Sequence, residues 1–211
     1  VPGNDRWSNA EQKVFVAFAI GELEKETGHA AKDVKHLLFI GSILNRSLGI
    51  DESYPLRAEQ TLVEAIKLSP TKQMVAFELA QLYAIIGRFD RAVEVLHPVW
   101  KGAPEYRDAG VHLWVLALVA KNSAVAEEVA SVLSLEDITE PDLFRLGEAY
   151  RRTEDYTGAL PIYARIVAVS PENAKYRATF AALLAHVGRL EEARVQAREA
   201  VRIDPSFAAE A

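Results

Sequence analysis

The chain has 211 residues, with 24 Lys and Arg against 30 Asp and Glu, and this net charge of −6 argues against a nucleic-acid-binding protein. Half of its residues are apolar, which excludes a disordered chain, and the absence of Cys excludes disulfides and thiolate sites. No apolar run approaches the roughly 20 residues that a membrane span needs. No initiating Met or signal-peptide layout is present, so we expect this sequence to be a piece of a longer protein.

The first predicted helix begins after Ser8 or Asn9 and runs to about Thr27, with Glu11 in its first turn and Gly28 after its end. Residues 14–20 are all apolar, which leaves this helix little polar face. Two interpretations stay open. It is the second helix of a repeat whose first helix is missing, or it binds another chain, because such a face needs cover. We treat residues 1–32 as a segment of their own.

Two predicted helix pairs follow. Asp33 caps the first pair, and Gln73 opens the second. The pairs end before Pro70 and Pro104, which lie 34 residues apart. Residues 48–55 form a turn about five residues longer than the later ones. This turn is either a functional loop or a tolerated insertion. Pro98 lies inside a predicted helix, where we expect a bend or a weakening.

The next pair is less regular, because Trp114 occupies a position where the other pairs have Gly or Ala. We expect its two helices on either side of a turn at residues 121–123.

The last two pairs carry the clearest pattern, and their closing residues Pro171 and Pro205 are again 34 apart. Gly147 is expected where two antiparallel helices come closest, since bulk there would push the helix axes apart. The pattern of the two pairs is Leu143-x2-Leu146-Gly147-x2-Tyr150 with Ala159-x3-Tyr163, then Phe180-Ala181-x2-Leu184 with Ala193-x3-Ala197-x2-Ala200. After Pro205 the sequence resembles the start of another helix.

A 34-residue period with large, small, aromatic and proline positions in this order resembles the tetratricopeptide repeat. The resemblance implies an all-α, right-handed superhelix of antiparallel helix pairs, with about five repeats over residues 33–211 in one continuous domain. It also implies a non-enzymatic scaffold that binds a protein or peptide in a concave groove lined by the first helix of each pair. Carried over by position, the expected groove residues are Leu38, Asn45, Arg46, Met74, Phe77, Gln81, Ile85, Val111, Val115, Phe144, Glu148, Arg151, Arg152 and His186, together with Lys175, Ala178, Ala182 and Ala185 in the last pair.

Members of this family that bind chaperone tails place Lys and Asn at two groove positions. This chain has Leu38 and Ser42 there, or Phe77 and Gln81, so the resemblance does not extend to that function. Two accounts of the central groove stay open. Val111, Val115 and Val119 are ordinary core, or they form an apolar seat for a partner segment flanked by Arg46 and by Arg151 with Arg152.

No motif for catalysis, a cofactor or a metal ion is recognisable. The five His residues are scattered singly, and acidic pairs such as Glu127-Glu128 lie near helix starts, where carboxylates favour the helix dipole. Two other roles stay open beside a free scaffold. The segment from Leu68 to Tyr83 is similar to repeat tails of bacterial O-antigen ligase or polymerase membrane proteins, and the first helix or the array ends are candidates for self-association.

Overall fold

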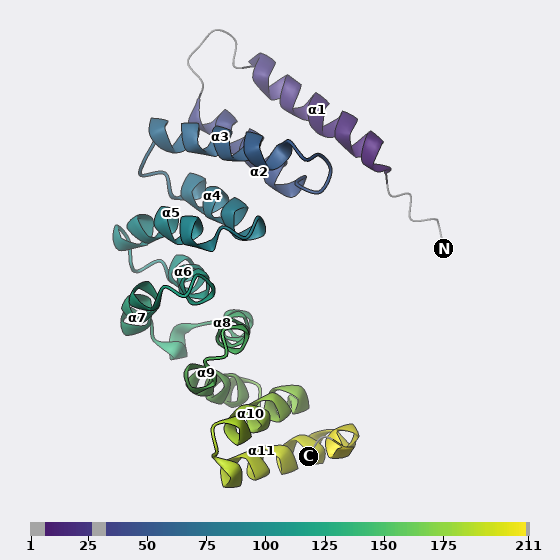
Figure 1. The fold of residues 1–211 in the computed structure, drawn as a ribbon, viewed down its shortest axis with the longest axis vertical. Coiled ribbons are helices and arrows are strands. Elements are labelled where there is room, and N and C mark those ends of the chain that lie inside the picture. Colours follow the sequence, from purple (N-terminus) through teal and green to yellow (C-terminus); the bar gives the residue numbers. More distant parts are fainter. Residues whose placement is uncertain (1–6, 27–32, 210–211) are drawn as a thin grey trace. The chain divides into compact units, whose positions relative to one another are not determined.

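The computed structural model describes residues 7–26 and 33–209, and this part of the chain is helical without β-strands (Figure 1). Within these residues, two short 3-10 helices, η1 (Leu135–Asp137) and η2 (Pro205–Ala209), accompany eleven α-helices. The α-helices are α1 (Asn9–Glu26), α2 (Val34–Arg46), α3 (Tyr54–Leu68), α4 (Gln73–Ile85), α5 (Phe89–Lys101), α6 (Arg107–Val119), α7 (Ser123–Val132), α8 (Glu140–Arg152), α9 (Tyr156–Val169), α10 (Ala174–His186) and α11 (Leu190–Ile203).

The chain divides into two compact units, residues 1–102 and 103–211. In the first unit α2 pairs with α3 and α4 with α5, while α4 also packs against α2 and α3, and α1 against α2. In the second unit the pairs are α6 with α7, α8 with α9 and α10 with α11; α8 packs on α6 and α10 on α9. These five pairs confirm the predicted all-α repeat fold. The boundary at residue 33, the single continuous domain and the right-handed superhelix stay predictions.

Glycine lies at the closest approach within two of the pairs. A Cβ atom on Gly147 would lie 2.7 Å from Cε2 of Tyr163, and one on Gly41 would lie 2.4 Å from Cδ2 of Leu62. Tyr163 and Leu62 occupy the same position of their pairs, four residues after a buried Ala. The predicted role of Gly147 at a helix contact is therefore confirmed, and the side chain that requires it is Tyr163.

The turn inside each of the last four pairs is built in the same way. Its central residue has a positive φ: +75° at Gly87, +56° at Lys121, +61° at Glu154 and +84° at Gly188. The next backbone N–H donates to a carbonyl five residues earlier, as Asp155 does to Tyr150 at 3.0 Å. This closes the helix in a Schellman-type turn, for which glycine is the least strained residue. The less regular pair therefore keeps the turn of its neighbours.

The irregular residue Trp114 is accommodated by its neighbours on α8. It is 4% exposed, and its indole N–H donates to the hydroxyl of Tyr150 at 3.1 Å. The two rings meet edge to face with centroids 6.3 Å apart. The bulk at this position therefore packs toward the next pair.

Helix α1 begins as predicted, with a reciprocal cap in which Ser8 N–H donates to Glu11 at 2.7 Å and Glu11 N–H to Ser8 Oγ at 3.3 Å. Thr27 and Gly28 lie outside the described residues. Val16 and Ile20 are buried, and ion pairs hold the helix: Lys13 with Asp51, and Glu24 with Arg57 at 2.8 Å. Hydrogen bonds from Lys13 and Ser53 hold the pKa of the Asp51 carboxyl well below its usual range.

Asp51 lies in the long turn, so this turn helps to attach α1. The turn is shorter than predicted: α3 begins at Tyr54, and Pro55 lies in its first turn, where a missing N–H costs nothing. Pro98 does not end α5, which continues to Lys101.

Candidate functional site

The expected groove residues of the first unit lie on α2 and α4, and they differ in exposure. Met74 and Ile85 are 63% and 56% exposed, Gln81 is exposed, and Phe77 is half-buried. These four side chains recur along one side of α4. On α2, Arg46 is exposed and Leu38 is buried. The α4 side chains can therefore meet a partner, whereas Leu38 belongs to the core.

Asn45 is a structural residue of the first unit. Its side chain is buried, and Nδ2 donates to the backbone carbonyl of Glu78 at 2.8 Å and to its carboxylate at 3.1 Å. These bonds join α2 to α4. A ligand could reach Asn45 only by displacing them.

In the second unit Val111 is 2% exposed and Val115 is half-buried, both on α6. Phe144 on α8 is half-buried and packs on Tyr176 of α10, with ring centroids 5.7 Å apart. Val111 therefore contributes to packing, and Phe144 contributes to packing while keeping part of its ring open.

Glu148, Arg151 and Tyr163 form a small polar cluster between α8 and α9. The Tyr163 hydroxyl donates to Glu148 at 2.6 Å, and Arg151 donates to the same carboxylate oxygen at 2.8 Å. Burial, followed by the bond to Glu148, raises the pKa of Tyr163. Arg151 remains exposed, as does its neighbour Arg152. The cluster holds the Arg151 side chain at the edge of α8.

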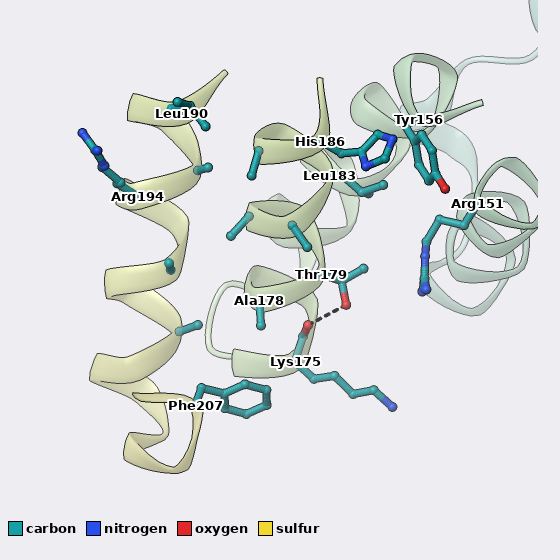
Figure 2. A pocket seen from close by; sticks show the side chains of 16 residues that line it. Arg151, Tyr156, Lys175, Ala178, Thr179, Leu183, His186, Leu190, Arg194 and Phe207 are labelled. Atoms are coloured by element: carbon teal, nitrogen blue, oxygen red, sulfur yellow. Dashed lines mark hydrogen bonds between the residues drawn. The ribbon is translucent and has the colours of Figure 1, made fainter. Parts of the chain in front are cut away.

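A hollow of about 740 Å³ lies against α10 and α11 in the second unit (Figure 2). Its lining includes six expected groove residues, Arg151, Lys175, Ala178, Ala182, Ala185 and His186, and alanines of α11. The His186 ring lies beside Tyr156, with centroids 3.9 Å apart, and Figure 2 shows Phe207 near Lys175 at the other end of α10. The hollow thus has an alanine floor between two aromatic ends.

The charges that line this hollow are positive. Arg151, Lys175 and Arg194 contribute cations, and no carboxylate is among the lining residues. Arg151 pairs with Glu148 at 2.8 Å and Arg194 with Glu191 at 2.5 Å. The carboxylates of Glu148 and Glu191 lie outside the lining. The Lys175 ammonium group makes no ion pair within the described ranges, residues 7–26 and 33–209. The hollow therefore suits a ligand that brings a carboxylate.

Several lining residues are absent from the sequence-based set: Tyr156, Leu190, Ala193, Arg194, Ala197 and Phe207. They lie on α9, α11 and η2, whereas the carried-over groove positions are confined to first helices. The regular alanines at 193, 197 and 200 marked a helix in the sequence, but nothing there indicated that their surface stays open.

Other kinds of site were sought across the same residues. No group of three or more His, Cys, Asp or Glu side chains within the described part of the chain is placed to hold a metal ion. Among those residues no helix is both long enough and apolar enough to cross a membrane.

Comparison with known proteins identifies a family for part of the chain. Residues 144–206 match the family model described as tetratricopeptide repeat. A 64-residue segment is 48% identical to the TPR repeat-containing thioredoxin TTL4 of Arabidopsis thaliana, covering 30% of this chain and 9% of that protein. Another of 61 residues is 39% identical to human DnaJ homolog subfamily C member 7, covering 29% and 12%. The matches thus span about a tenth of these relatives.

Solved structures of low sequence identity share the fold over most of the chain. A tetratricopeptide repeat protein from Parabacteroides merdae superposes with a TM-score of 0.63 at 16% identity, covering 89% of this chain and 73% of its own. YrrB, a TPR protein with an unusual peptide-binding site, gives 0.63 at 14%, covering 89% and 96%. MamA from Desulfovibrio magneticus RS-1 gives 0.61 at 21%, covering 84% and 98%. Residues 144–206 are therefore tetratricopeptide repeats, and the chain has the helical-repeat fold of tetratricopeptide proteins.

Proposed function

We propose that this protein is a non-enzymatic interaction module that binds a segment of another polypeptide on the first helices of its repeats and in the hollow on α10 and α11. The family supports the coarser part of this proposal, because tetratricopeptide repeats are typically protein-binding scaffolds. The observation that carries the finer part is the hollow on α10 and α11, with three cations and no carboxylate in its lining.

The lining suggests the chemistry of the bound segment. An alanine floor leaves room for apolar side chains of the partner, and their burial contributes about 25 cal/mol per Å². Lys175 and Arg151 flank that floor and favour a carboxylate on the partner. The bound segment is therefore apolar with one or more acidic residues.

The exposed side chains of α4 offer a second surface in the first unit. Met74, Phe77 and Ile85 share one side of this helix, and Met adapts readily to partners of different shape. This surface contributes apolar contact, whereas the hollow contributes charge recognition as well.

A peptide-binding experiment tests the charge recognition. Peptides that combine large apolar and acidic residues are presented to the protein, and the affinity of those retained is measured with Lys175→Ala and with Arg151→Ala. Each change should weaken binding several-fold. Arg198→Ala serves as the control, because Arg198 is an exposed cation of α11 outside the hollow. Equal losses in all three variants would contradict a specific role for the hollow.

Binding kinetics and stability separate recognition from packing. Replacing Arg151 and Arg152 together by Ala should chiefly slow association and reduce its salt dependence. Phe77→Ala and Phe144→Ala should each weaken binding by more than about 1 kcal/mol if the rings are anchors. Normal affinity together with lost stability would show instead that these rings only pack.

The similarity of residues 68–83 to O-antigen ligase tails receives no support from the relatives described above. We therefore do not propose a role in a membrane enzyme of polysaccharide assembly.

A further inference from the structure

The exposed side of α1 is an apolar patch in need of cover. The patch consists of Trp7, Ala10, Glu11, Val14, Phe15 and Phe18. Its large members are strongly exposed, Val14 at 70% and Phe18 at 64%, and Trp7 packs edge to face on Phe15 with centroids 5.1 Å apart. The opposite side of α1 is already used, since Val16 and Ile20 are buried. The patch is thus a second apolar face.

The hollow on α10 and α11 lies where the preceding pair has larger side chains. In the preceding pair, Ala159, Tyr163 and Ile166 of α9 are all 0% exposed, and the Tyr163 ring packs against Gly147 and Glu148 of α8, the first helix of the same pair. The corresponding residues of α11 are Ala193, Ala197 and Ala200, of which Ala197 is only half-buried, and η2 packs on α11. Ala197 stands where the preceding pair has the Tyr163 ring, so the hollow has room for large side chains of another segment.

Patch and hollow are complementary in size and in charge. The patch presents three aromatic rings and a valine, whereas the floor of the hollow is alanine, so large side chains meet small ones as in a packed core. The patch carries one charge, the carboxylate of Glu11, and the hollow carries cations and no carboxylate. The patch supplies large apolar side chains and a carboxylate, and the hollow supplies small side chains and cations.

We propose that α1 of one copy docks into the hollow on α10 and α11 of a second copy. This inference rests on the proposed function, because it treats the hollow as a polypeptide-binding site and names its occupant. The two surfaces are different, so the contact is heterologous: one copy donates the helix and the other accepts it. Phe15 and Phe18 enter the alanine floor, and Glu11 lies toward the Lys175 ammonium.

The mass of the 211-residue protein, measured by sedimentation over a wide concentration range, tests this. The mass should rise with concentration. The double variant Phe15→Ser with Phe18→Ser should lower the association constant at least tenfold, and so should Ala182→Glu, which adds bulk and a carboxylate to the floor. Controls of the same kind are Phe39→Ser, 60% exposed on α2, and Ala164→Glu, exposed on α9; both should associate as the parent protein does.

Mixing the two defective proteins gives the decisive result. The Phe15→Ser, Phe18→Ser variant keeps its hollow, and the Ala182→Glu variant keeps its patch, so the mixture should form a complex although neither protein associates alone. A parent protein that stays monomeric at every concentration would overturn the proposal. So would self-association of Ala182→Glu as strong as that of the parent protein, because this would indicate contact between two α1 helices.

A separate result distinguishes failure of this inference from failure of the proposed function. The monomeric double variant leaves the hollow open, and it can be offered the same acidic, apolar peptides described above. If it binds them in a manner that depends on Lys175 while the parent protein never self-associates, the hollow is a peptide site and α1 is not its occupant. If neither peptides nor α1 bind, both proposals are wrong.

Discussion

At the scale of single residues, the repeat depends on a few positions where size or backbone conformation is constrained. Gly147 is required by the Tyr163 ring, and residues of positive φ close the turns between paired helices. Asn45, expected in the groove, instead joins α2 to α4 through Glu78. A position carried over from a family pattern thus identifies a location, and the neighbouring atoms decide its role.

Replacing Gly147 by Leu should destabilise the second unit by roughly 1–3 kcal/mol, because the new side chain overlaps the Tyr163 ring. Urea unfolding measures the change. Gly21→Ala is the control, since nothing lies within 4 Å of a Cβ atom at that helical position, and it should be neutral or stabilising by up to about 1 kcal/mol. Unchanged unfolding of Gly147→Leu would show that the two helices can separate without cost.

Replacing Glu154 by Gly should stabilise the protein by about 1 kcal/mol. Glu154 has a φ of +61°, a conformation that costs an L-residue with a Cβ atom roughly that much. The turns at Gly87 and Gly188 already have glycine at the matching position. Thermal unfolding measures the gain, and a loss of stability would mean that the Glu154 side chain makes a contact worth more than the strain.

Stability should depend on pH through His112. Burial, with the nearby charge of Arg145, lowers the pKa of this imidazole, whose Nδ1 lies 3.0 Å from the Arg145 guanidinium. As the pH falls below about 6.5, the unfolded chain takes up the proton first, so the free energy of unfolding decreases until the pH passes the lower folded pKa. Above about pH 6.5, His112 is neutral in both the folded and the unfolded state, so it makes no contribution to the pH dependence of stability. Urea unfolding at several pH values should show that the free energy of unfolding falls less steeply with decreasing pH in His112→Gln than in the parent protein. An equally steep fall in both would contradict His112 as the cause of the pH dependence.

At the scale of elements, α1 is the helix whose two sides have different roles. One side packs on the first unit through Val16 and Ile20, and the other presents Val14, Phe15 and Phe18. The sequence left two interpretations of this helix open, a repeat remnant or a partner-binding helix. The division of its apolar residues between a buried and an exposed side is compatible with both at once.

A matched pair of substitutions on α1 separates the two sides. Ile20 is 1% exposed, so Ile20→Ala should destabilise the first unit by about 2–4 kcal/mol through the cavity that it leaves. Phe18 is 64% exposed, so Phe18→Ala should change stability by less than about 0.5 kcal/mol. Chemical unfolding of dilute protein measures both. Similar costs for the two changes would mean that the outer side of α1 is also packed within one copy.

At the scale of the whole molecule, the chain divides at residue 102 although the repeat pattern continues across it. Repeat arrays gain stability from each pair and from its contacts with adjacent pairs, so a change in one repeat can stay local. The single continuous domain expected from the sequence and the division into two units make different predictions for unfolding.

We expect the two units to open separately. In the Gly147→Leu protein, amide hydrogen exchange should accelerate in α8, α9 and their neighbours in residues 103–211, while α2 to α5 keep the protection that they have in the parent protein. Mass spectrometry of proteolytic fragments measures this. Equal acceleration in both units would indicate one cooperative domain instead.

The sequence by itself determined the repeat, because the period of 34 residues and the small, aromatic and proline positions follow from how two helices pack and turn. It predicted the five helix pairs and the role of Gly147 for that reason. Only the tertiary structure decided which side chains remain exposed to solvent. The partial exposure of Ala197 and the burial of Asn45 depend on the side chains that surround each residue in space. Asn45, for example, is buried against Glu78 of α4, which lies 33 residues along the chain.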